Sequence, residues 1–240
     1  MIRIGVECES SEGDSWGIGR TVTGLLNELA KRPELSREFR FIYYYKKNIP
    51  SFSLYYYIIL PIKIFFTKPD IVFFPNYMLP FGIFCKTIVT LTEDLYREMH
   101  GHDIPWHYRM AYKIFSGHAA RKATIINVYS QTSGKEVGRL FGIENKRIFV
   151  NYLGVQANEA KVANEAKNYI LYVGQAFPRR HLKETMLACE KLGVKLIAVG
   201  TGKHDRVSNE KLEELYRNAR LSVYVSDTEA MPAQHIRYSF

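Results

Sequence analysis

Apolar residues along this chain fall into short runs, and most runs are followed by a longer amphipathic segment. The first run, Ile2–Val6, precedes a segment in which Val22, Leu25, Leu26 and Leu29 recur at helical spacing. Short runs rich in Val, Ile, Tyr and Phe predict strands, whereas apolar residues three or four positions apart predict helices. Strand and helix alternate throughout, so we predict an α/β fold on mostly parallel sheets.

The predicted elements follow from these two periodicities. Strands are expected at 2–6, 39–45, 70–74, 86–91, 125–129, 147–150, 169–173, 194–200 and 221–225. Helices are expected at 21–31, 53–66, 105–122, 133–141, 181–192 and 209–219. The segment at 53–66 is unusual because it is almost wholly apolar and contains Pro61.

Residues 156–167 interrupt the alternation. The tetrapeptide Asn-Glu-Ala-Lys occurs at 158–161 and again at 164–167, and no apolar face is sustained there. We therefore predict an N-terminal domain over 1–157, a linker over 158–167 and a C-terminal domain over 168–240. Only three strands are predicted in the second domain, so we expect it to be an incomplete sheet with an uncovered edge.

Composition narrows the choice of partners. Hydrophobic residues make up 47% of the 240 residues, and the formal net charge is +9. This charge favours an anionic partner, either a nucleotide diphosphate, a membrane surface or a nucleic acid. The basic residues are scattered rather than concentrated on one element, so we expect no nucleic-acid partner. The widely spaced Cys8, Cys85 and Cys189 are expected to be reduced thiols.

The sequence also predicts a location in the cell. The chain opens directly on a predicted strand without a signal-peptide pattern, which predicts a cytoplasmic protein. The apolar segment 52–66 is too short to span a bilayer. Together with the aromatic and basic run Tyr43–Lys47 it could lie on an anionic membrane surface, which would make any association peripheral and electrostatic. Alternatively, its aromatic residues pack against the sheet, and both can hold for different faces of one helix.

Two loops at predicted strand ends carry groups suited to phosphate. Arg179 and Arg180 stand before a helix, where guanidinium and backbone N–H groups suit a diphosphate. Gly17 and Gly19, followed by Arg20, open the first helix and would let the backbone approach a phosphate. The alternatives are a solvated arginine pair and a plain tight turn. Ligands of parallel sheets bind at the carboxyl ends of strands, where both loops lie.

Carboxylates and histidines supply the other candidate chemistry. Glu93 and Asp94 follow the strand at 86–91, where either could hold sugar hydroxyls or act as a base. Alternatively, Asp94 caps the next helix and Glu93 is solvated. The histidines at 100, 102 and 107 lie on a loop broken by Gly and Pro without an H-E-x-x-H pattern, so we expect no metal site.

Taken together, these segments resemble the retaining glycosyltransferases of family 4, which use sugar nucleotides and have the GT-B fold of two facing Rossmann-like domains. Segments in the family's order occur at 17–20, 69–75, 89–95, 119–123, 130–136, 148–155, 169–174, 178–182, 215–219 and 226–229. The resemblance implies a GT-B-like α/β fold whose second domain is incomplete. It also implies transfer of a sugar from a nucleoside-diphosphate sugar to a saccharide or lipid-linked acceptor, with retention of configuration.

The resemblance implies roles for the residues singled out above. The candidate catalytic residues are Glu93, Asp94 and Glu229, and the candidate donor-binding residues are Gly17, Gly19, Arg20, Arg179, Arg180 and Ser226. No cofactor beyond the nucleotide-sugar substrate and no obligatory metal are implied. A bound diphosphate is expected between the glycine segment and the arginine pair.

The chain also departs from the family pattern. Arg180 stands where the family usually has a lysine, and Glu93 stands where it usually has a histidine. Gln175 replaces a common arginine, Arg237 occupies the position of a second glutamate, and residues 233–240 resemble nothing in the family. The alternative is therefore a truncated, catalytically inactive remnant that acts at most as a binding module.

Overall fold

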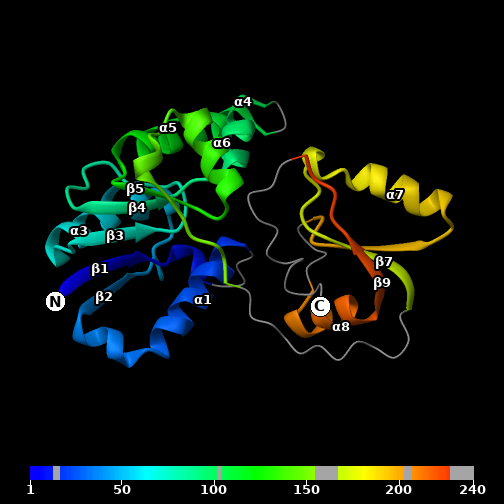
Figure 1. Cartoon of the computed structure of the whole chain (residues 1–240), viewed down its shortest axis with the longest axis horizontal. Coiled ribbons are helices and arrows are strands. Elements are labelled where there is room, and N and C mark those ends of the chain that lie inside the picture. The colour runs from blue at the N-terminus through cyan, green and yellow to red at the C-terminus, as the bar shows by residue number, and fades with distance from the viewer. Residues whose placement is uncertain (13–16, 102–103, 155–166, 203–206, 228–240) are drawn as a thin grey trace. The chain divides into compact units, whose positions relative to one another are not determined.

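The computed structural model describes residues 1–12, 17–101, 104–154, 167–202 and 207–227. It divides the chain into two compact units, Met1–Tyr152 and Leu153–Phe240. The predicted linker at 158–167 lies outside the described residues except for Lys167, which begins a strand. Each unit is an α/β structure with its own parallel sheet (Figure 1).

The sheet of the first unit has six parallel strands in the order β2-β1-β3-β4-β5-β6. The strands are β1 (Ile2–Glu7), β2 (Phe39–Tyr44), β3 (Ile71–Phe74), β4 (Lys86–Thr90), β5 (Ile125–Val128) and β6 (Ile148–Val150). Ile4 of β1 pairs with Phe41 on one side and Ile71 on the other, so β1 lies between two neighbours. All six strands were predicted from their apolar runs, with ends that differ by at most one residue.

Six α-helices connect these strands. They are α1 (Ile18–Ala30), α2 (Phe52–Leu54), α3 (Leu60–Thr67), α4 (Glu93–His100), α5 (Trp106–Lys122) and α6 (Gln131–Phe141). Short 3₁₀ turns lie at Glu9–Ser11, Pro33–Arg37 and Asn145–Arg147. The sequence analysis did not predict α4, because Glu93–His100 is short and mainly polar, and its apolar residues are only Leu95, Tyr96 and Met99. The predicted helix at 53–66 is present, but a π-helical turn, Tyr55–Ile59, joins α2 to α3.

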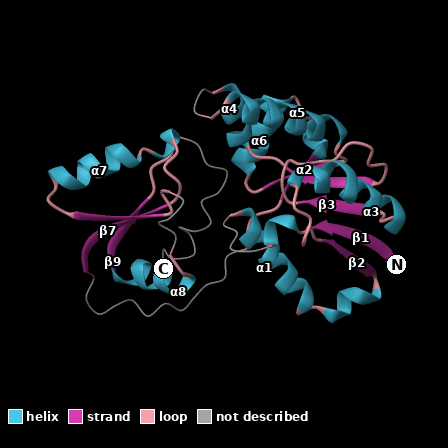
Figure 2. Ribbon diagram, turned by 180° about the vertical axis from the view of Figure 1, so that it is seen from behind, coloured by secondary structure: helices cyan, strands magenta, loops and turns pink. Residues whose placement is uncertain are grey.

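Helices cover both faces of the first sheet. In both views α1 lies on the opposite side of the strands from α5 and α6 (Figures 1 and 2). On the α1 face, Val22 is buried with Val6 and Cys8. On the other face, α3, α5 and α6 pack on the alternate strand residues, among them Val72 and Phe74. The strand residues therefore alternate between two apolar layers, which is why these runs are continuously apolar.

The second unit repeats the pattern on a smaller scale. Its strands are β7 (Lys167–Val173), β8 (Lys195–Val199) and β9 (Ala219–Val223), in the parallel order β8-β7-β9. A 3₁₀ turn, Pro178–Arg180, leads into α7 (Leu182–Lys191), and α8 (Asn209–Asn218) precedes β9. The helices α7 and α8 lie on opposite faces of the three strands (Figures 1 and 2). Tyr169 ties β7 to α8, because its hydroxyl donates a hydrogen bond to the Leu215 carbonyl at 2.7 Å.

Both sheets share one topological feature that positions ligands. In each sheet, the first strand lies between the second and the third. The connection from the first strand to the second and the connection from the second to the third therefore cross the sheet in opposite directions. The switch points are therefore β1/β3 in the first unit and β7/β9 in the second. Ligands of parallel α/β sheets bind at such switch points, beside the carboxyl ends of the strands.

Gly5, in the middle of β1, is closely surrounded by neighbouring side chains. A Cβ at Gly5 would stand 2.7 Å from Cε2 of Tyr44 and 3.1 Å from Cγ2 of Val72. The Tyr44 ring cannot move aside easily, because it is 2% exposed and its hydroxyl lies 2.6 Å from Oγ1 of Thr67. We expect Gly5→Ala to lower the free energy of unfolding by about 1–3 kcal/mol through overpacking. Urea unfolding of the full chain measures this.

Gly24 provides the matched control. It lies in α1, and a Cβ there would meet no atom within 4 Å. Gly24→Ala should raise the stability by about 0.5–1 kcal/mol, because alanine is the better helix former. If the two substitutions change the free energy of unfolding equally, Gly5 is not closely packed against Tyr44 and Val72.

Candidate functional site

The switch point of the second unit gathers the charged residues that the sequence singled out. Gly174 ends β7, and its N–H donates to the Val199 carbonyl at 2.9 Å. Its φ of +150° and the Arg180 guanidinium, which would lie 3.3 Å from an added Cβ, both favour glycine here. The missing side chain therefore makes room for Arg180 beside the strand end.

The arginine loop, Pro178–Arg180, is stacked on aromatic rings. The guanidinium carbons of Arg179 and Arg180 lie 4.7 and 5.4 Å from the centre of the Phe177 ring. Arg180 also lies 5.6 Å from the ring of Tyr224, just beyond β9. Such cation–π contacts hold planar guanidinium groups in a defined orientation. Both arginines are half-buried rather than freely solvated, so the solvated alternative does not describe them.

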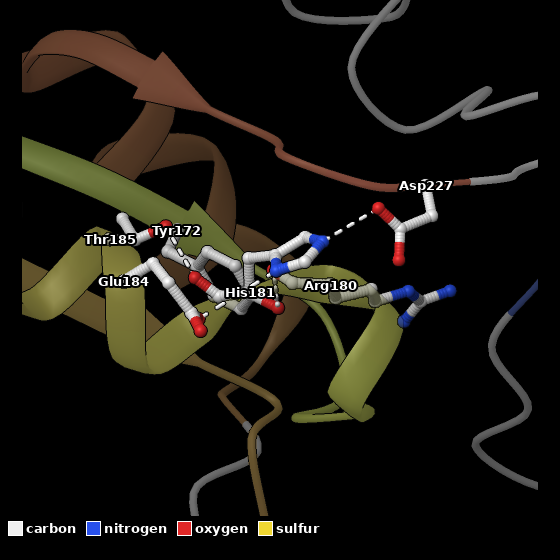
Figure 3. Close-up of polar contacts among 6 residues, drawn as sticks. All are labelled: Tyr172, Arg180, His181, Glu184, Thr185 and Asp227. Atoms are coloured by element: carbon white, nitrogen blue, oxygen red, sulfur yellow. Dashed lines mark hydrogen bonds and ion pairs between the residues drawn. The ribbon is translucent and has the colours of Figure 1, made fainter.

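The residues after β9 fasten this loop to the sheet. The Asp227 N–H donates a hydrogen bond to the Arg179 carbonyl at 3.0 Å. The Asp227 carboxylate lies 2.8 Å from Nε2 of His181, the residue that follows the arginine pair. Figure 3 shows His181 and Arg180 projecting from one loop while Asp227 reaches His181 from the end of β9. Asp227 therefore holds the chain on both sides of Arg180.

His181 has an unusual backbone for its residue type. Its φ and ψ of 46° and 40° are left-handed, a region in which histidine is more frequent than most non-glycine residues. It is the N-cap of α7, and its carbonyl accepts hydrogen bonds from the Thr185 N–H at 3.0 Å and the Thr185 hydroxyl at 2.9 Å. The hydrogen bond to Asp227, with Glu184 also nearby, raises the pKa of His181 above its usual value.

Sequence analysis did not select His181 or Asp227 as site residues. Their positions in the sequence could have indicated them, because His181 directly follows the arginine pair and Asp227 directly follows Ser226 beyond a predicted strand. Ser226 is half-buried beside Asp227, at the carboxyl end of β9. Glu229 and Arg237 lie outside the described residues.

In the first unit, the glycine segment opens α1 as predicted. Gly17 is the N-cap with a φ of +66°, and its carbonyl accepts from the Thr21 N–H at 3.1 Å. Gly19 is buried in the first turn, and Arg20 is half-buried beside it. The predicted phosphate-binding residues are thus divided between the two units, with the glycines in one and the arginines in the other.

The carboxylate pair lies in the first turn of α4. Glu93 is only 5% exposed, and the Ser133 hydroxyl donates to its Oε1 at 3.1 Å. The alternative of a solvated Glu93 is therefore wrong, because this side chain joins α4 to the first turn of α6. Thr92, rather than Asp94, is the N-cap residue of α4. Asp94 is half-buried in the same turn.

The switch point of the first unit holds a buried acid that the sequence did not reveal. Glu7 ends β1 and is fully buried, with its Oε1 accepting the Glu9 N–H at 2.7 Å. Burial raises the pKa of Glu7 to about 7, while hydrogen bonds from Glu9 and from the Tyr56 hydroxyl oppose the rise. Asn76, after β3, donates to the Tyr56 hydroxyl at 3.1 Å. This chain of polar groups links the ends of β1 and β3 to the π-helical turn.

The remaining cysteines and histidines form no further centre in the parts of the chain that are described. Cys8, Cys85 and Cys189 are free thiols, as expected. Within the described ranges, no group of three His, Cys, Asp or Glu side chains is placed to hold a metal ion. His102 and Asp103, which belong to the histidine-rich loop, lie outside those ranges.

Comparison with known proteins identifies the fold. No protein-family model matches the chain, and a search of curated proteins finds no significant relative. Among solved structures, WaaG, a glycosyltransferase involved in lipopolysaccharide biosynthesis, matches with a TM-score of 0.64 at 15% identity. Alr3699/HepE of Anabaena, in complex with UDP and glucose, matches at 0.57 and 12%. In both cases 99% of this chain and 78% of the other are covered.

A third structure agrees with these two. The lipopolysaccharide outer core galactosyltransferase WaaB matches with a TM-score of 0.52 at 14% identity, over 98% of this chain and 76% of its own. At such low identity the likeness establishes the fold alone. The chain therefore has the GT-B type of α/β fold, as the sequence predicted.

The buried acid at the end of β1 makes the stability of the chain depend on pH. The pKa of Glu7 is about 7 in the folded state and near 4.5 in the unfolded chain, so the folded state holds the proton more tightly. Stability should therefore fall by roughly 3 kcal/mol as the pH rises from about 4.5 to about 7. Glu7→Gln, which cannot ionise, should remove most of this fall in urea unfolding measured across that range.

The exposed Glu34 serves as the control for Glu7. Glu34→Gln should leave the pH dependence of stability unchanged, because Glu34 lies on the exposed turn Pro33–Arg37 and not in the buried core. If Glu7→Gln keeps the full decline of stability between acidic and neutral pH, the decline comes from other groups.

Proposed function

We propose that this chain is a glycosyltransferase that takes its sugar from a nucleoside-diphosphate donor. The observation that carries this proposal is the arginine loop, Pro178–Arg180, held at the β7/β9 switch point of a GT-B type of fold. Two guanidinium groups beside a helix N-terminus suit a diphosphate, which carries two negative charges. The complex of the fold neighbour HepE with UDP and glucose supports a donor of this class.

In the proposed reaction, the second unit stabilises the negative charge of the leaving diphosphate. As the glycosidic bond to the donor breaks, negative charge develops on the departing diphosphate. Arg179 and Arg180, fixed on Phe177 before the reaction begins, would stabilise that charge without reorganising. Ser226 lies at the neighbouring strand end and is proposed to contact the donor. Glu229 is proposed to orient the donor sugar, on the family resemblance alone.

We further propose the finer features that the resemblance implies. The enzyme would belong to the retaining family 4, with Gly17, Gly19 and Arg20 contributing donor contacts from the first unit. Glu93 and Asp94 would be the catalytic candidates of that unit. The acceptor would be a saccharide or a lipid-linked saccharide. No obligatory metal is proposed, because the arginines supply positive charge to the diphosphate. The anomeric configuration of the product by NMR and the activity in EDTA test these two features separately.

Arg180 provides the direct test of the donor site. We expect Arg180→Ala to weaken the binding of UDP-glucose by tenfold or more, because a charge-assisted hydrogen bond contributes about 1.5–3 kcal/mol. Isothermal titration calorimetry measures the affinity, and thermal unfolding shows whether the variant is folded. Arg180→Gln, which keeps much of the length without the charge, should show a loss of similar size.

Arg217 is the matched control for Arg180. It is exposed in the last turn of α8, just before β9 begins, and so lies at the amino edge of the same sheet. Arg217→Ala should leave UDP-glucose binding unchanged. Unchanged affinity of Arg180→Ala for every nucleoside diphosphate tested would place the site elsewhere. Donor binding without sugar transfer would instead assign the chain as a binding module.

We also propose that the first unit binds an anionic membrane surface. The helical segment 52–67 has two apolar faces, and only one of them packs on the sheet. Tyr55, Tyr56, Leu60 and Ile64 are buried, as the packing alternative predicted. On the other face Phe65 and Phe66 are 66% and 76% exposed. Within the described residues, no helix is both long and apolar enough to cross a bilayer.

This exposed surface continues onto α5. The ring centres of Tyr57 and Phe115 lie 5.5 Å apart with the rings tilted, and an open apolar groove of about 330 Å³ lies between the π-helical turn and α5. We call the following exposed side chains the aromatic face: Tyr57, Ile58, Ile62, Phe65, Phe66, Trp106, Met110 and Ile114. Exposed apolar side chains that gather on a surface in this way are a candidate binding site.

The basic residues within and beside these helices favour an anionic membrane as the proposed partner. Residues 45–69 contain Lys46, Lys47, Lys63 and Lys68, and residues 104–124 contain Arg109, Lys113, Arg121 and Lys122; neither range contains an acidic residue. Exposed aromatic rings that insert among lipid headgroups, with lysine and arginine around them, suit an anionic bilayer.

Removing two exposed rings tests this surface. We expect Phe65→Ser with Phe66→Ser to reduce binding to vesicles that contain phosphatidylglycerol by roughly tenfold or more, since each ring buries apolar area worth about 1.5 kcal/mol or more. Vesicle co-sedimentation measures the binding. It should also weaken as salt is raised, because screening shortens the electrostatic field to about 8 Å at physiological strength.

Leu192→Ser is the matched control, since Leu192 is 71% exposed but lies in the second unit, at the end of α7. It should leave vesicle binding unchanged. Equal binding to vesicles of neutral lipid, or no effect of the two Phe substitutions, would exclude an anionic membrane as the partner.

A further inference from the structure

The strongest unexplained feature of the donor edge is a histidine held between two carboxylates. Nε2 of His181 lies 2.8 Å from Oδ1 of Asp227, and its Nδ1 lies 3.8 Å from Oε2 of Glu184. The two carboxylates come from different elements, the end of β9 and the first turn of α7 (Figure 3). The imidazole thus bridges the two sides of the switch point immediately beside Arg180.

The backbone conformation of His181 also fixes the position of the imidazole. The left-handed conformation of His181 turns the chain between the arginine loop and α7. Its carbonyl is engaged by both the N–H and the hydroxyl of Thr185, which fixes the start of the helix. The side chain therefore cannot be replaced at this turn by a β-branched residue without strain.

Asp227 carries an unfavourable charge for the site that it helps to build. Its N–H and its carboxylate hold the loop on either side of Arg180, through the Arg179 carbonyl and the His181 ring. The same carboxylate, however, is a negative charge next to the place proposed for a negatively charged diphosphate. Only a positive partner for Asp227 removes this conflict.

We propose that His181 is a positioning residue whose proton controls donor binding: the imidazolium neutralises Asp227 and fixes the arginine loop, and its loss weakens the hold on the diphosphate. This inference rests on the proposed donor site. His181 touches Asp227 rather than the donor, so it acts through Asp227 and Arg180.

The charges that face His181 determine the direction of the effect. They are Asp227 from the end of β9, Glu184 from α7, and Arg179 and Arg180 from the preceding loop. The two carboxylates raise the pKa of His181 above its usual value, and the hydrogen bond to Asp227 is the larger cause. A raised pKa means that the ion pair is complete at low pH and is lost as the pH rises through the folded-state pKa. Donor affinity should therefore fall with rising pH.

UDP-glucose is a suitable probe, because its diphosphate ester does not titrate between about pH 6 and pH 9, whereas histidine does. Calorimetry of the full chain should show that the affinity for UDP-glucose is about fivefold lower at the alkaline end of this range than at the acidic end. A change of this size is expected from the loss of one partly exposed ion pair. His181→Asn keeps a residue that tolerates the left-handed turn but cannot ionise. The affinity of this variant for UDP-glucose should not change with pH across this range. It should equal the affinity that the unmodified chain has at alkaline pH.

Asp227→Asn makes the second, opposite test. It retains the backbone hydrogen bond to Arg179 but removes the negative charge. We expect this variant to bind UDP-glucose at alkaline pH at least as tightly as the unmodified chain does. The midpoint of its pH dependence should move down toward the ordinary pKa of histidine. NMR titration of the His181 ring should show the same downward shift of its pKa. His107→Asn, on the exposed start of α5, should keep the pH dependence of the unmodified chain.

The outcomes separate this inference from the proposed function. If the unmodified chain binds UDP-glucose with an affinity that falls with pH and His181→Asn abolishes the fall, the inference is supported. If the chain binds UDP-glucose but His181→Asn keeps the same pH dependence, the inference is overturned while the donor site stands. If neither UDP-glucose nor any other nucleoside-diphosphate sugar binds at any pH, the donor site fails and the inference fails with it.

Discussion

Parallel pairing is the constraint on which the rest of this molecule depends. Since every strand in a parallel sheet points the same way, all the loops that leave carboxyl ends gather at one edge. In each unit the first strand lies between the second and the third, which opens a switch point at that edge. The arginine loop and Asp227 meet at one such point, and Glu7, Tyr56 and Asn76 meet at the other. The chemistry of both units follows from this arrangement.

Both switch points contain charges whose state depends on their surroundings. In the first unit, burial opposes ionisation of Glu7, so its carboxyl takes up a proton more readily than a solvated one. In the second, nearby carboxylates favour the charged form of His181. One shift comes mainly from desolvation and the other from a hydrogen-bonded partner, yet both raise a pKa. Because both pKa values are raised in the folded state, both groups favour folding at low pH and lose that contribution as the pH rises, although protonation neutralises the acid and charges the imidazole.

The aromatic segment shows how one stretch of sequence serves two environments. Tyr55, Tyr56, Leu60 and Ile64 cover the sheet, while Phe65 and Phe66 face away from it. An almost wholly apolar helix of this kind buries one face against its own fold and leaves a second apolar face for a partner. The basic residues that flank this segment, and the lack of acidic ones within it, are the reason we propose an anionic membrane as the partner of that second face.

The sequence by itself determined which elements form and in what order, because the spacing of apolar residues is a local property. It located the six strands of the first unit, the helix around Pro61 and the arginine pair after β7. It did not determine α4, whose short apolar stripe of Leu95, Tyr96 and Met99 lies among mainly polar residues. Nor did it determine that Glu93 is buried and accepts a hydrogen bond from Ser133. The partnership of His181 with Asp227 joins residues 46 positions apart. Only the tertiary structure, by placing β9 next to β7, brought those two side chains together.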